Sequence, residues 1–276
     1  MKLPVSVIII AQNEAPNIGF AISSVIDHFD QVILVDSFST DDTPKICGNY
    51  SGLEFFQHEF LDWASQKNWA LENCKIRNGV VLFLDADEYI TSEFVSELSV
   101  IVESGVDFAA IYLNPSYIFL GRKLKYAYGH PKIRRIFKVK GLKYYCEGAR
   151  DHSVSPSGPL LHMAEPFIHH DRKPFSAWVQ KQVRNAYKEA RFYLSSDLGQ
   201  FNEDIPADLR FRRGIRANIW NRLPLFVRPF LYFFYKYVVR LGFMDGRAGL
   251  VYCFMHGLWY QMLVDIAIVE TRLNKS

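Results

Sequence analysis

The sequence predicts an α/β fold in which an open, mostly parallel sheet is followed by a helical C-terminal extension. Two short runs, residues 5–10 and 80–84, are apolar except for Ser6 and rich in β-branched side chains, the pattern of strands buried on both faces. After the first run, apolar residues recur at helical spacing, at positions 18, 22, 25, 26 and 29. Strands that alternate with helices favour a parallel sheet with crossover helices.

The expected elements follow one another in order along the chain. Strands are expected at residues 5–10, 31–35, 53–57, 80–84 and 108–113, and helices at residues 18–29, 63–74, 92–102 and 174–194. A loop at residues 39–44 leads into a further short helix, because Ser, Thr and Asp accept hydrogen bonds from free N–H groups and Pro fits the first turn. Residues 114–172 are rich in Pro, Gly, Tyr and basic side chains, which predicts irregular loops and short strands around a pocket.

The composition narrows the classes of protein to consider. The 276 residues can bury a large core, and they are 49% hydrophobic and 15% aromatic, slightly more than is usual for a soluble protein. A formal net charge of +3 does not indicate a nucleic-acid partner. The four cysteines form no C-x-x-C pair, which argues against a zinc site or a disulfide framework and favours reduced thiols in the cytosol. No signal peptide is expected, because no small-residue cleavage site follows a long apolar stretch near the N-terminus.

Polar residues follow three of the predicted strands at the point where each strand ends. Asn13 and Glu14 follow the first strand, Asp36 ends the second, and Asp85 and Asp87 follow residues 80–84. Ligands of open parallel sheets bind beyond the carboxyl ends of the strands, so these side chains are expected at one rim. Two aspartates there suit a divalent cation, Mg²⁺ or Mn²⁺, held together with substrate phosphate oxygens. For an isolated D-x-D, the alternative is a solvated acidic turn.

Four motifs in order carry a family resemblance: Val5-Ser6-Val7-Ile8-Ile9 with Asn13-Glu14, Val35-Asp36-Ser37-Phe38-Ser39-Thr40-Asp41, Lys67-Asn68 with Ala70, and Leu84-Asp85-Ala86-Asp87-Glu88. Over residues 3–175 the chain resembles the family 2 glycosyltransferases, which have the GT-A fold. The resemblance implies that Asn13, Glu14 and Asp36 bind the nucleoside part of a nucleotide sugar. It also implies that Asp85 approaches the ribose or the phosphates and that Asp87 is a metal ligand.

The resemblance suggests two further contacts to the donor. Lys67 would be a cationic contact near the nucleotide, as a lysine acts as a point charge for phosphate, and the alternative is a surface lysine on a helix. Residues 169–173 resemble the His-x-Asp-Arg-Lys stretch of related transferases, which makes His169 a candidate metal ligand. The alternative for the adjacent histidines is an ordinary loop.

The catalytic base is expected in a later part of the same domain. An inverting transfer needs a base that takes the proton of the acceptor hydroxyl on the face opposite the leaving diphosphate. Transferases that build lipopolysaccharide core carry a His-Glu pair there, and in this sequence Arg150 and Asp151 stand at the corresponding positions. Asp151 is therefore the first candidate for the base and Glu147 the second, and a structural or surface carboxylate is the alternative for both.

The C-terminal part of the chain indicates a membrane surface. We expect a catalytic domain at residues 1–205 and a helical, basic and aromatic extension at residues 206–276. Between residues 210 and 247 arginines alternate with large apolar side chains, a pattern that suits anionic lipid. Residues 248–264 carry no Asp, Glu, Lys or Arg but are marginal for crossing a core of ~30 Å, which favours a re-entrant or interfacial helix. The alternative is a helical subdomain that packs on the catalytic domain.

Together these patterns predict an inverting family 2 hexosyltransferase that uses a divalent cation and a nucleotide-sugar donor, with UDP as the expected nucleotide. The expected acceptor is a lipid-anchored glycan of the cell envelope, such as lipopolysaccharide core. A polyprenyl-phosphate glycosyltransferase and a non-catalytic membrane-associated scaffold of the same fold are the alternatives. The expected location is the cytoplasmic face of the inner membrane, in peripheral or monotopic association with anionic lipids, and no nucleic acid is expected as a partner.

Overall fold

The computed structural model describes residues 2–129, 131–147, 150–154, 158–195 and 220–274, with backbone only at residues 147, 150–152, 154 and 221. The chain divides into two compact units. Unit 1 consists of Met1–Lys123, His130–Tyr145 and Asp151–Lys173, and unit 2 consists of Leu124–Gly129, Cys146–Arg150 and Pro174–Ser276. The predicted boundary between residues 205 and 206 lies outside the described residues.

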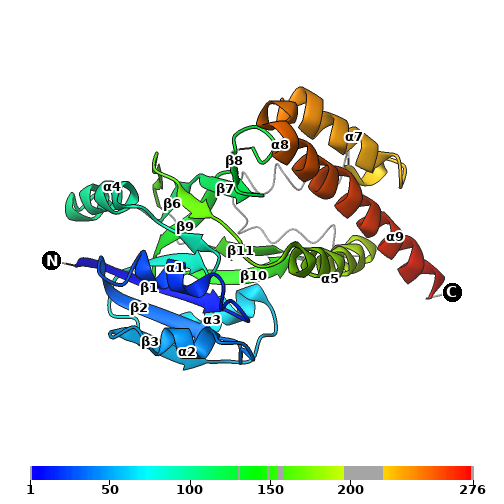
Figure 1. The fold of residues 1–276 in the computed structure, drawn as a ribbon. Coiled ribbons are helices and arrows are strands. Elements are labelled where there is room, and N and C mark those ends of the chain that lie inside the picture. Colours follow the sequence, from blue (N-terminus) through cyan, green and yellow to red (C-terminus); the bar gives the residue numbers. More distant parts are fainter. Residues whose placement is uncertain (1, 130, 148–149, 155–157, 196–219, 275–276) are drawn as a thin grey trace. The chain divides into compact units, whose positions relative to one another are not determined.

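Unit 1 is built on a seven-stranded sheet in the order β12-β6-β9-β4-β1-β2-β3 (Figure 1). β1 pairs in parallel with both β2 and β4, whereas β9 is antiparallel to β4 and β6. This confirms the predicted α/β class and the mostly parallel sheet. The strands of this sheet are β1 (Leu3–Ala11), β2 (Phe29–Asp36), β3 (Leu53–Gln57), β4 (Val80–Asp85), β6 (Ala110–Leu113), β9 (Ile133–Lys138) and β12 (Leu160–His162).

Side chains of β1 enter two different hydrophobic clusters, which explains why only Ser6 breaks its run of apolar residues. Val7 and Ile9 belong to a cluster that also holds Phe94 of α4, whereas Ile8 and Ile10 belong to a second cluster with residues of α3. Because successive strand residues point to opposite faces, both faces of the sheet are covered. The helices of unit 1 are α1 (Ile18–Ser23), α2 (Thr43–Cys47), α3 (Trp63–Asn73) and α4 (Ser92–Glu103).

Two of these helices differ from the expectation at their ends. α1 stops at Ser23, and Phe29, which was expected on the helical stripe, begins β2 instead. The helical spacing continues beyond α1 because turn residues such as Val25 still pack into the core. α4 ends at Glu103, one residue beyond the expectation, and its cap is Thr91, whose hydroxyl accepts a hydrogen bond from the Phe94 amide.

The described part of residues 114–172 contains the short strands that the composition predicted. Four short strands form a second sheet in the order β5-β13-β7-β8. Within it His169 pairs with Glu88, so two segments that are 81 positions apart in the sequence lie side by side. The strands of the two smaller sheets are β5 (Glu88–Tyr89), β7 (Pro115–Phe119), β8 (Arg122–Leu124), β10 (Lys143–Glu147), β11 (Arg150–Val154) and β13 (Phe167–His169), with β10 and β11 forming a separate two-stranded sheet.

Unit 2 is helical in its described C-terminal part. α5 (Phe175–Leu194) packs against α9 (Tyr260–Leu273) through a core that includes Ala186, Ala190 and Ile268. The remaining helical segments are η2 (Trp220–Arg222), α7 (Arg228–Phe234), η3 (Tyr235–Val239), η4 (Gly242–Asp245), α8 (Gly246–Tyr252) and η5 (Cys253–Trp259). The predicted arginines between residues 210 and 216 lie outside the described residues.

The last helical segments of unit 2 follow one another directly from Gly242 to Leu273, 32 residues with a mean hydropathy of 1.2 over the most apolar window, and the backbone bends at Gly246, where φ is 63°. By length and composition this helix could cross a membrane, and 44% of that window is buried inside the protein. The stretch is therefore longer than the residues 248–264 expected from the sequence. Gly257 lets another helix approach closely, because a Cβ there would lie 3.3 Å from the Phe233 Cα.

Candidate functional site

The turn from β4 to β5 brings a carboxylate against an imidazole. Asp87 is buried, and its Oδ1 lies 3.5 Å from the Nδ1 of His169, which belongs to β13. The same imidazole nitrogen lies 3.7 Å from the Oε1 of Glu88. The His170 amide donates to the Asp87 carbonyl at 2.9 Å, which fixes the two segments together. The His169 ring is stacked on Tyr117 with 4.7 Å between ring centroids, so its orientation is set from both sides.

This group of three residues suits a divalent cation. Ligand atoms of Asp87, Glu88 and His169 all lie within 4.8 Å of one another. Mg²⁺ binds oxygen at about 2.1 Å, so two of its ligand atoms can be separated by at most ~4.2 Å, and the Asp87–His169 pair meets that limit. Both carboxylate oxygens of Glu88 already accept hydrogen bonds, from Arg135 and from the Asp85 amide. Asp87 and His169 are therefore the better placed of the three, and their role as metal ligands remains a prediction.

Arg135 of β9 holds the neighbouring carboxylates in place. Its guanidinium donates to both oxygens of Asp85, at 3.3 and 2.6 Å, and to Oε1 of Glu88 at 2.5 Å. Burial opposes the ionisation of Asp85, but Arg135 and then Lys67 hold the pKa of this carboxyl well below its usual range. The pKa of Glu88 is raised, first by burial and also by the charge on Asp85, against the opposing effect of Arg135. Asp85 is therefore a charged, oriented carboxylate beside the candidate metal site.

The loops after β1 and β2 are bound to each other. Asn13 has a left-handed backbone, with φ of 54°, and its side-chain oxygen accepts a hydrogen bond from the Thr40 amide at 2.8 Å. The backbone amide of Asn13 donates to the Ser39 hydroxyl at 2.8 Å. Asp36 is fully buried and accepts from the amide of Ser39 at 2.9 Å and from the Ser39 hydroxyl, while Gln57 donates to it at 3.2 Å. Asn13 and Asp36 thus shape the two loops.

Glu14 is placed by residues from the far end of unit 1. Lys173 donates to its Oε1 at 2.5 Å, and Asn17 donates to its Oε2 at 2.8 Å. The same Asn17 amide reaches Asp171 at 2.9 Å, so the stretch after β13 is tied to the loop after β1. The pKa of Glu14 is raised, first by burial and also by the charge of Asp87, while Lys173 acts in the opposite direction.

Lys67 is a buried residue of α3 rather than a surface lysine. Only 4% of its surface is exposed, and its ammonium lies 5.0 Å from the ring centroid of Tyr144 and 5.7 Å from that of Phe83. Its charge contributes to the lowered pKa of Asp85, so it lies within electrostatic range of the rim. The alternative of an exposed helix lysine is therefore wrong.

The candidate bases are described only in part. Glu147 ends β10 and Asp151 belongs to β11, but both side chains lie outside the described residues. Their roles remain predictions.

Three residues of this network were not among the predicted site residues. Arg135 lies on an antiparallel strand within the stretch expected to be irregular, and nothing in its local sequence marks it. Glu88 directly follows the D-x-D. Its two carboxylate oxygens accept hydrogen bonds from Arg135 and from a backbone amide, and the contact with Arg135 depends on the tertiary structure. Lys173 belongs to the His-x-Asp-Arg-Lys stretch, so the resemblance offered a signal for it.

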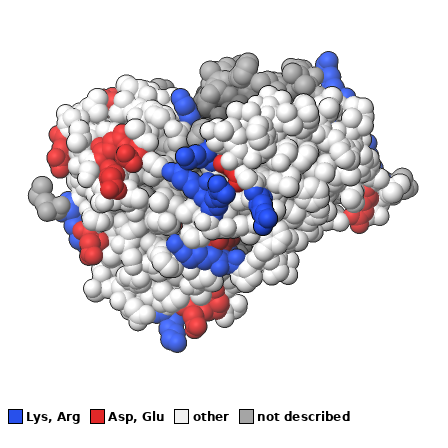
Figure 2. Space-filling view, turned by 45° about the horizontal axis from the view of Figure 1, so that its top comes forward, with Lys and Arg blue, Asp and Glu red and all other residues white. Residues whose placement is uncertain are grey.

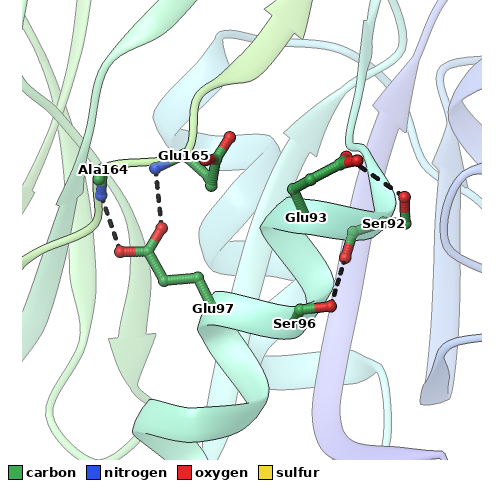
Figure 3. Close-up of a pocket in the computed structure, with 6 residues that line it drawn as sticks. All are labelled: Ser92, Glu93, Ser96, Glu97, Ala164 and Glu165. Atoms are coloured by element: carbon green, nitrogen blue, oxygen red, sulfur yellow. Dashed lines mark hydrogen bonds between the residues drawn. The ribbon is translucent and has the colours of Figure 1, made fainter.

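A hollow beside α4 offers no comparable group of candidate ligands. It is lined by Ser92, Glu93, Ser96, Glu97, Ala164 and Glu165 (Figure 3). The Glu97 carboxylate accepts hydrogen bonds from the Ala164 amide at 2.9 Å and from the Glu165 amide at 2.8 Å (Figure 3). This carboxylate anchors the chain before β13, which is a structural role.

Comparisons with known proteins agree with the resemblance. The family described as Glycosyl transferase family 2 matches residues 6–140, a span that includes both rim loops, Lys67, the Asp87 turn and Arg135. An uncharacterized glycosyltransferase of Rickettsia felis is 39% identical over 100 residues, which are 36% of this chain and 34% of that protein. One of Rickettsia prowazekii is 38% identical over 100 residues, 36% of this chain and 33% of that protein. The chain thus spans about a third of the length of the curated relatives it matches.

Solved structures of glycosyltransferases are also similar. S. aureus TarS 1-349 in complex with UDP-GlcNAc is 15% identical with a TM-score of 0.49, over 99% of this chain and 92% of that chain. Mycobacterium tuberculosis glucosyl-3-phosphoglycerate synthase in complex with Mn²⁺ and UDP-glucose is 23% identical with a TM-score of 0.35, over 41% of this chain and 43% of that chain. Residues 6–140 thus match the family 2 glycosyltransferases, and the mostly parallel α/β sheet that they help to form agrees with the GT-A fold class.

Proposed function

We propose that the chain is an inverting glycosyltransferase that moves a sugar, a hexose, from a UDP donor to a lipid-anchored glycan of the cell envelope, such as lipopolysaccharide core. The observation that carries this proposal is the meeting of Asp87 and His169, 3.5 Å apart, at the end of a central strand of a family 2 domain. Between them they offer the oxygen and nitrogen ligands of a divalent cation beside a charged Asp85.

Different residues of the rim would bind different parts of the donor. Asp87 and His169 would hold Mg²⁺ or Mn²⁺, which offsets the negative charge of the departing diphosphate. The loops shaped by Asn13 and Asp36 would receive the nucleoside, with Glu14 beside them. Lys67 adds positive charge near the phosphates. Because Arg135 engages both oxygens of Asp85, Asp85 presents a fixed charge to the ribose or phosphates rather than a mobile ligand.

The transfer itself is an in-line displacement. The acceptor hydroxyl oxygen forms a bond to the anomeric carbon while the bond from that carbon to the diphosphate oxygen breaks, and the hydroxyl proton passes to a base. We assign the base to Asp151, with Glu147 as the rival. An α-linked donor then yields a β-linked product.

The proposed location is the cytoplasmic face of the inner membrane, where a nucleotide donor and a lipid-anchored acceptor meet. The long apolar helix from Gly242 to Leu273 supports membrane association. Anionic lipid is the proposed surface, because arginines are frequent between residues 210 and 247.

Hydrolysis or transfer of UDP-sugars by the purified full chain tests the proposal. Asp87→Asn and His169→Ala should each lower turnover by about 100-fold or more, because loss of a ligand weakens binding of the metal. Asp107→Asn is the matched control, since this exposed aspartate lies in a loop away from the rim strands. Full turnover in the presence of a chelator, or by Asp87→Asn, would contradict the metal assignment. No turnover of any UDP-sugar by the wild type would instead favour the non-catalytic scaffold.

A further inference from the structure

The helix formed by α7 and η3 exposes apolar side chains and buries charged ones, which is the opposite of the usual arrangement in a soluble protein. Along α7 and η3, large apolar side chains recur at helical spacing on the exposed side, and each is at least 42% exposed. Two charged residues of the same helix, Arg228 and Lys236, are only 1% and 4% exposed. The exposed stripe consists of Val227, Phe230, Leu231, Phe234, Tyr235, Val238 and Val239.

The buried charges of unit 2 contact partners inside the unit, although Nη1 of Arg228 has no hydrogen-bond partner among the described residues. The Arg228 Nε donates to Oδ1 of Asp265 at 2.7 Å, and the other oxygen of Asp265 accepts from the Phe226 amide at 2.7 Å. The Lys236 ammonium lies 4.5 Å from the ring centroid of Tyr252. Asp245 accepts from three successive backbone amides at residues 125–127, at 2.8 to 3.0 Å. Because these charged side chains face inward, they do not make the exposed surface of the helices more polar.

The neighbouring helix continues the same surface. Leu250 and Phe254 are 44% and 46% exposed, and η5 packs against α7. Six charged residues occur between positions 223 and 269, all within the described part of the chain, and four of them are buried. In the space-filling view, this helical region is largely white (Figure 2).

An apolar surface of this extent is costly in water and favourable in lipid. Large exposed apolar patches mark interaction sites, and charges that face inward while apolar side chains face outward are typical of helices in a bilayer. We propose that the stripe on α7–η3, with the adjoining face of α8–η5, is embedded among the acyl chains of one membrane leaflet. This rests on and deepens the membrane location in the proposed function: hydrophobic insertion supplies the attachment, and the arginines would add a preference for anionic lipid.

The geometry favours insertion into one leaflet over a crossing. The stripe covers 13 residues, a helix length of about 20 Å, which is shorter than a hydrocarbon core of ~30 Å. The longer helix that ends at Leu273 is covered along α9 by α5, whose Arg184, Lys188 and Arg191 are exposed. A full crossing would carry those three cations into hydrocarbon, at a cost of a few kcal/mol each. Lipid also fits the stripe better than a second copy of this chain does. A contact between two soluble chains gives no reason for the charges of the same helix to face inward.

Flotation with vesicles tests the insertion. The full chain should float with neutral phosphatidylcholine vesicles, and high salt should not release it, because the contact is apolar. Phe230→Ser/Phe234→Ser/Val238→Ser should lower this partition by at least about tenfold, since three exposed side chains leave the acyl layer. The matched control is Leu61→Ser/Val100→Ser/Val106→Ser. It removes three apolar side chains of unit 1 that are 70%, 68% and 44% exposed, and it should float like the wild type.

Three results would overturn the proposal. Flotation that requires anionic lipid and is lost in high salt would make the attachment electrostatic. A soluble dimer that ignores vesicles would assign the stripe to a second copy of the chain. Unchanged flotation of the stripe variant, with circular dichroism equal to the wild type, would place the contact elsewhere. Hydrolysis of UDP-sugar by the same preparations is scored separately, so a failure of the proposed transferase activity is distinguishable from a failure of insertion.

Discussion

Replacing Arg135 should destabilise unit 1 far more than replacing a surface arginine. The Arg135 side chain is 11% exposed, and it is the cation that hydrogen-bonds to both Asp85 and Glu88, whose side chains are 33% and 3% exposed. Arg135→Met keeps a comparable volume but leaves two carboxylates without this partner. Breaking a buried ion pair from one side costs about 3–5 kcal/mol, which is a large share of the ~5–15 kcal/mol by which domains are stable.

Arg77 provides the matched control for this prediction. Arg77 pairs with Glu54 at 2.5 Å, but the side chains are 52% and 31% exposed, so Arg77→Met should cost no more than about 1 kcal/mol. The free energy of unfolding is measured by denaturant titration in mild detergent, followed by circular dichroism. Adding Glu88→Gln to Arg135→Met should recover part of the loss, because one of the two unpaired charges is removed. Equal costs for Arg135→Met and Arg77→Met would refute the reasoning.

Three further predictions concern the rim, the thiols and the base. Asp36→Ala should weaken donor binding and raise KM more than it lowers kcat, because the loop loses its two hydrogen bonds from Ser39 to Asp36. An unchanged KM would show that Asp36 does not belong to the nucleotide site. Cys146 is exposed and should react with iodoacetamide at pH 8 in the native protein, whereas full labelling should need denaturant, because the other three thiols are buried: Cys47, Cys74 and Cys253. Burial raises the pKa of Cys47 and Cys74 to about 11, which leaves little thiolate to react, and equal labelling rates would argue against the described core. Asp151→Asn should lower kcat far more than donor affinity, and an unaffected variant would move the role of base to Glu147.

Much of the donor side could be predicted from the sequence because it depends on local patterns. Continuous β-branched runs identified β1 and β4, and polar residues at strand ends identified Asn13, Asp36 and Asp87. The predicted strands are confirmed, whereas the donor roles of these polar residues remain predictions. They rest on the fact that a parallel sheet carries the carboxyl ends of its strands to one edge, so positions along the chain indicate neighbours in space.

The surroundings of those residues depended on the tertiary structure. Arg135 reaches Asp85 from a strand that runs antiparallel between β4 and β6, and strand order is a matter of pairing between distant segments. The same holds for His169, which meets Asp87 only because β13 pairs with β5. In the C-terminal helices, composition alone indicated apolar and cationic residues. Which of these side chains face outward depends on how the helices pack. The orientation of α7 and η3, together with the Arg228–Asp265 pair, turns the charges inward and leaves the apolar stripe exposed.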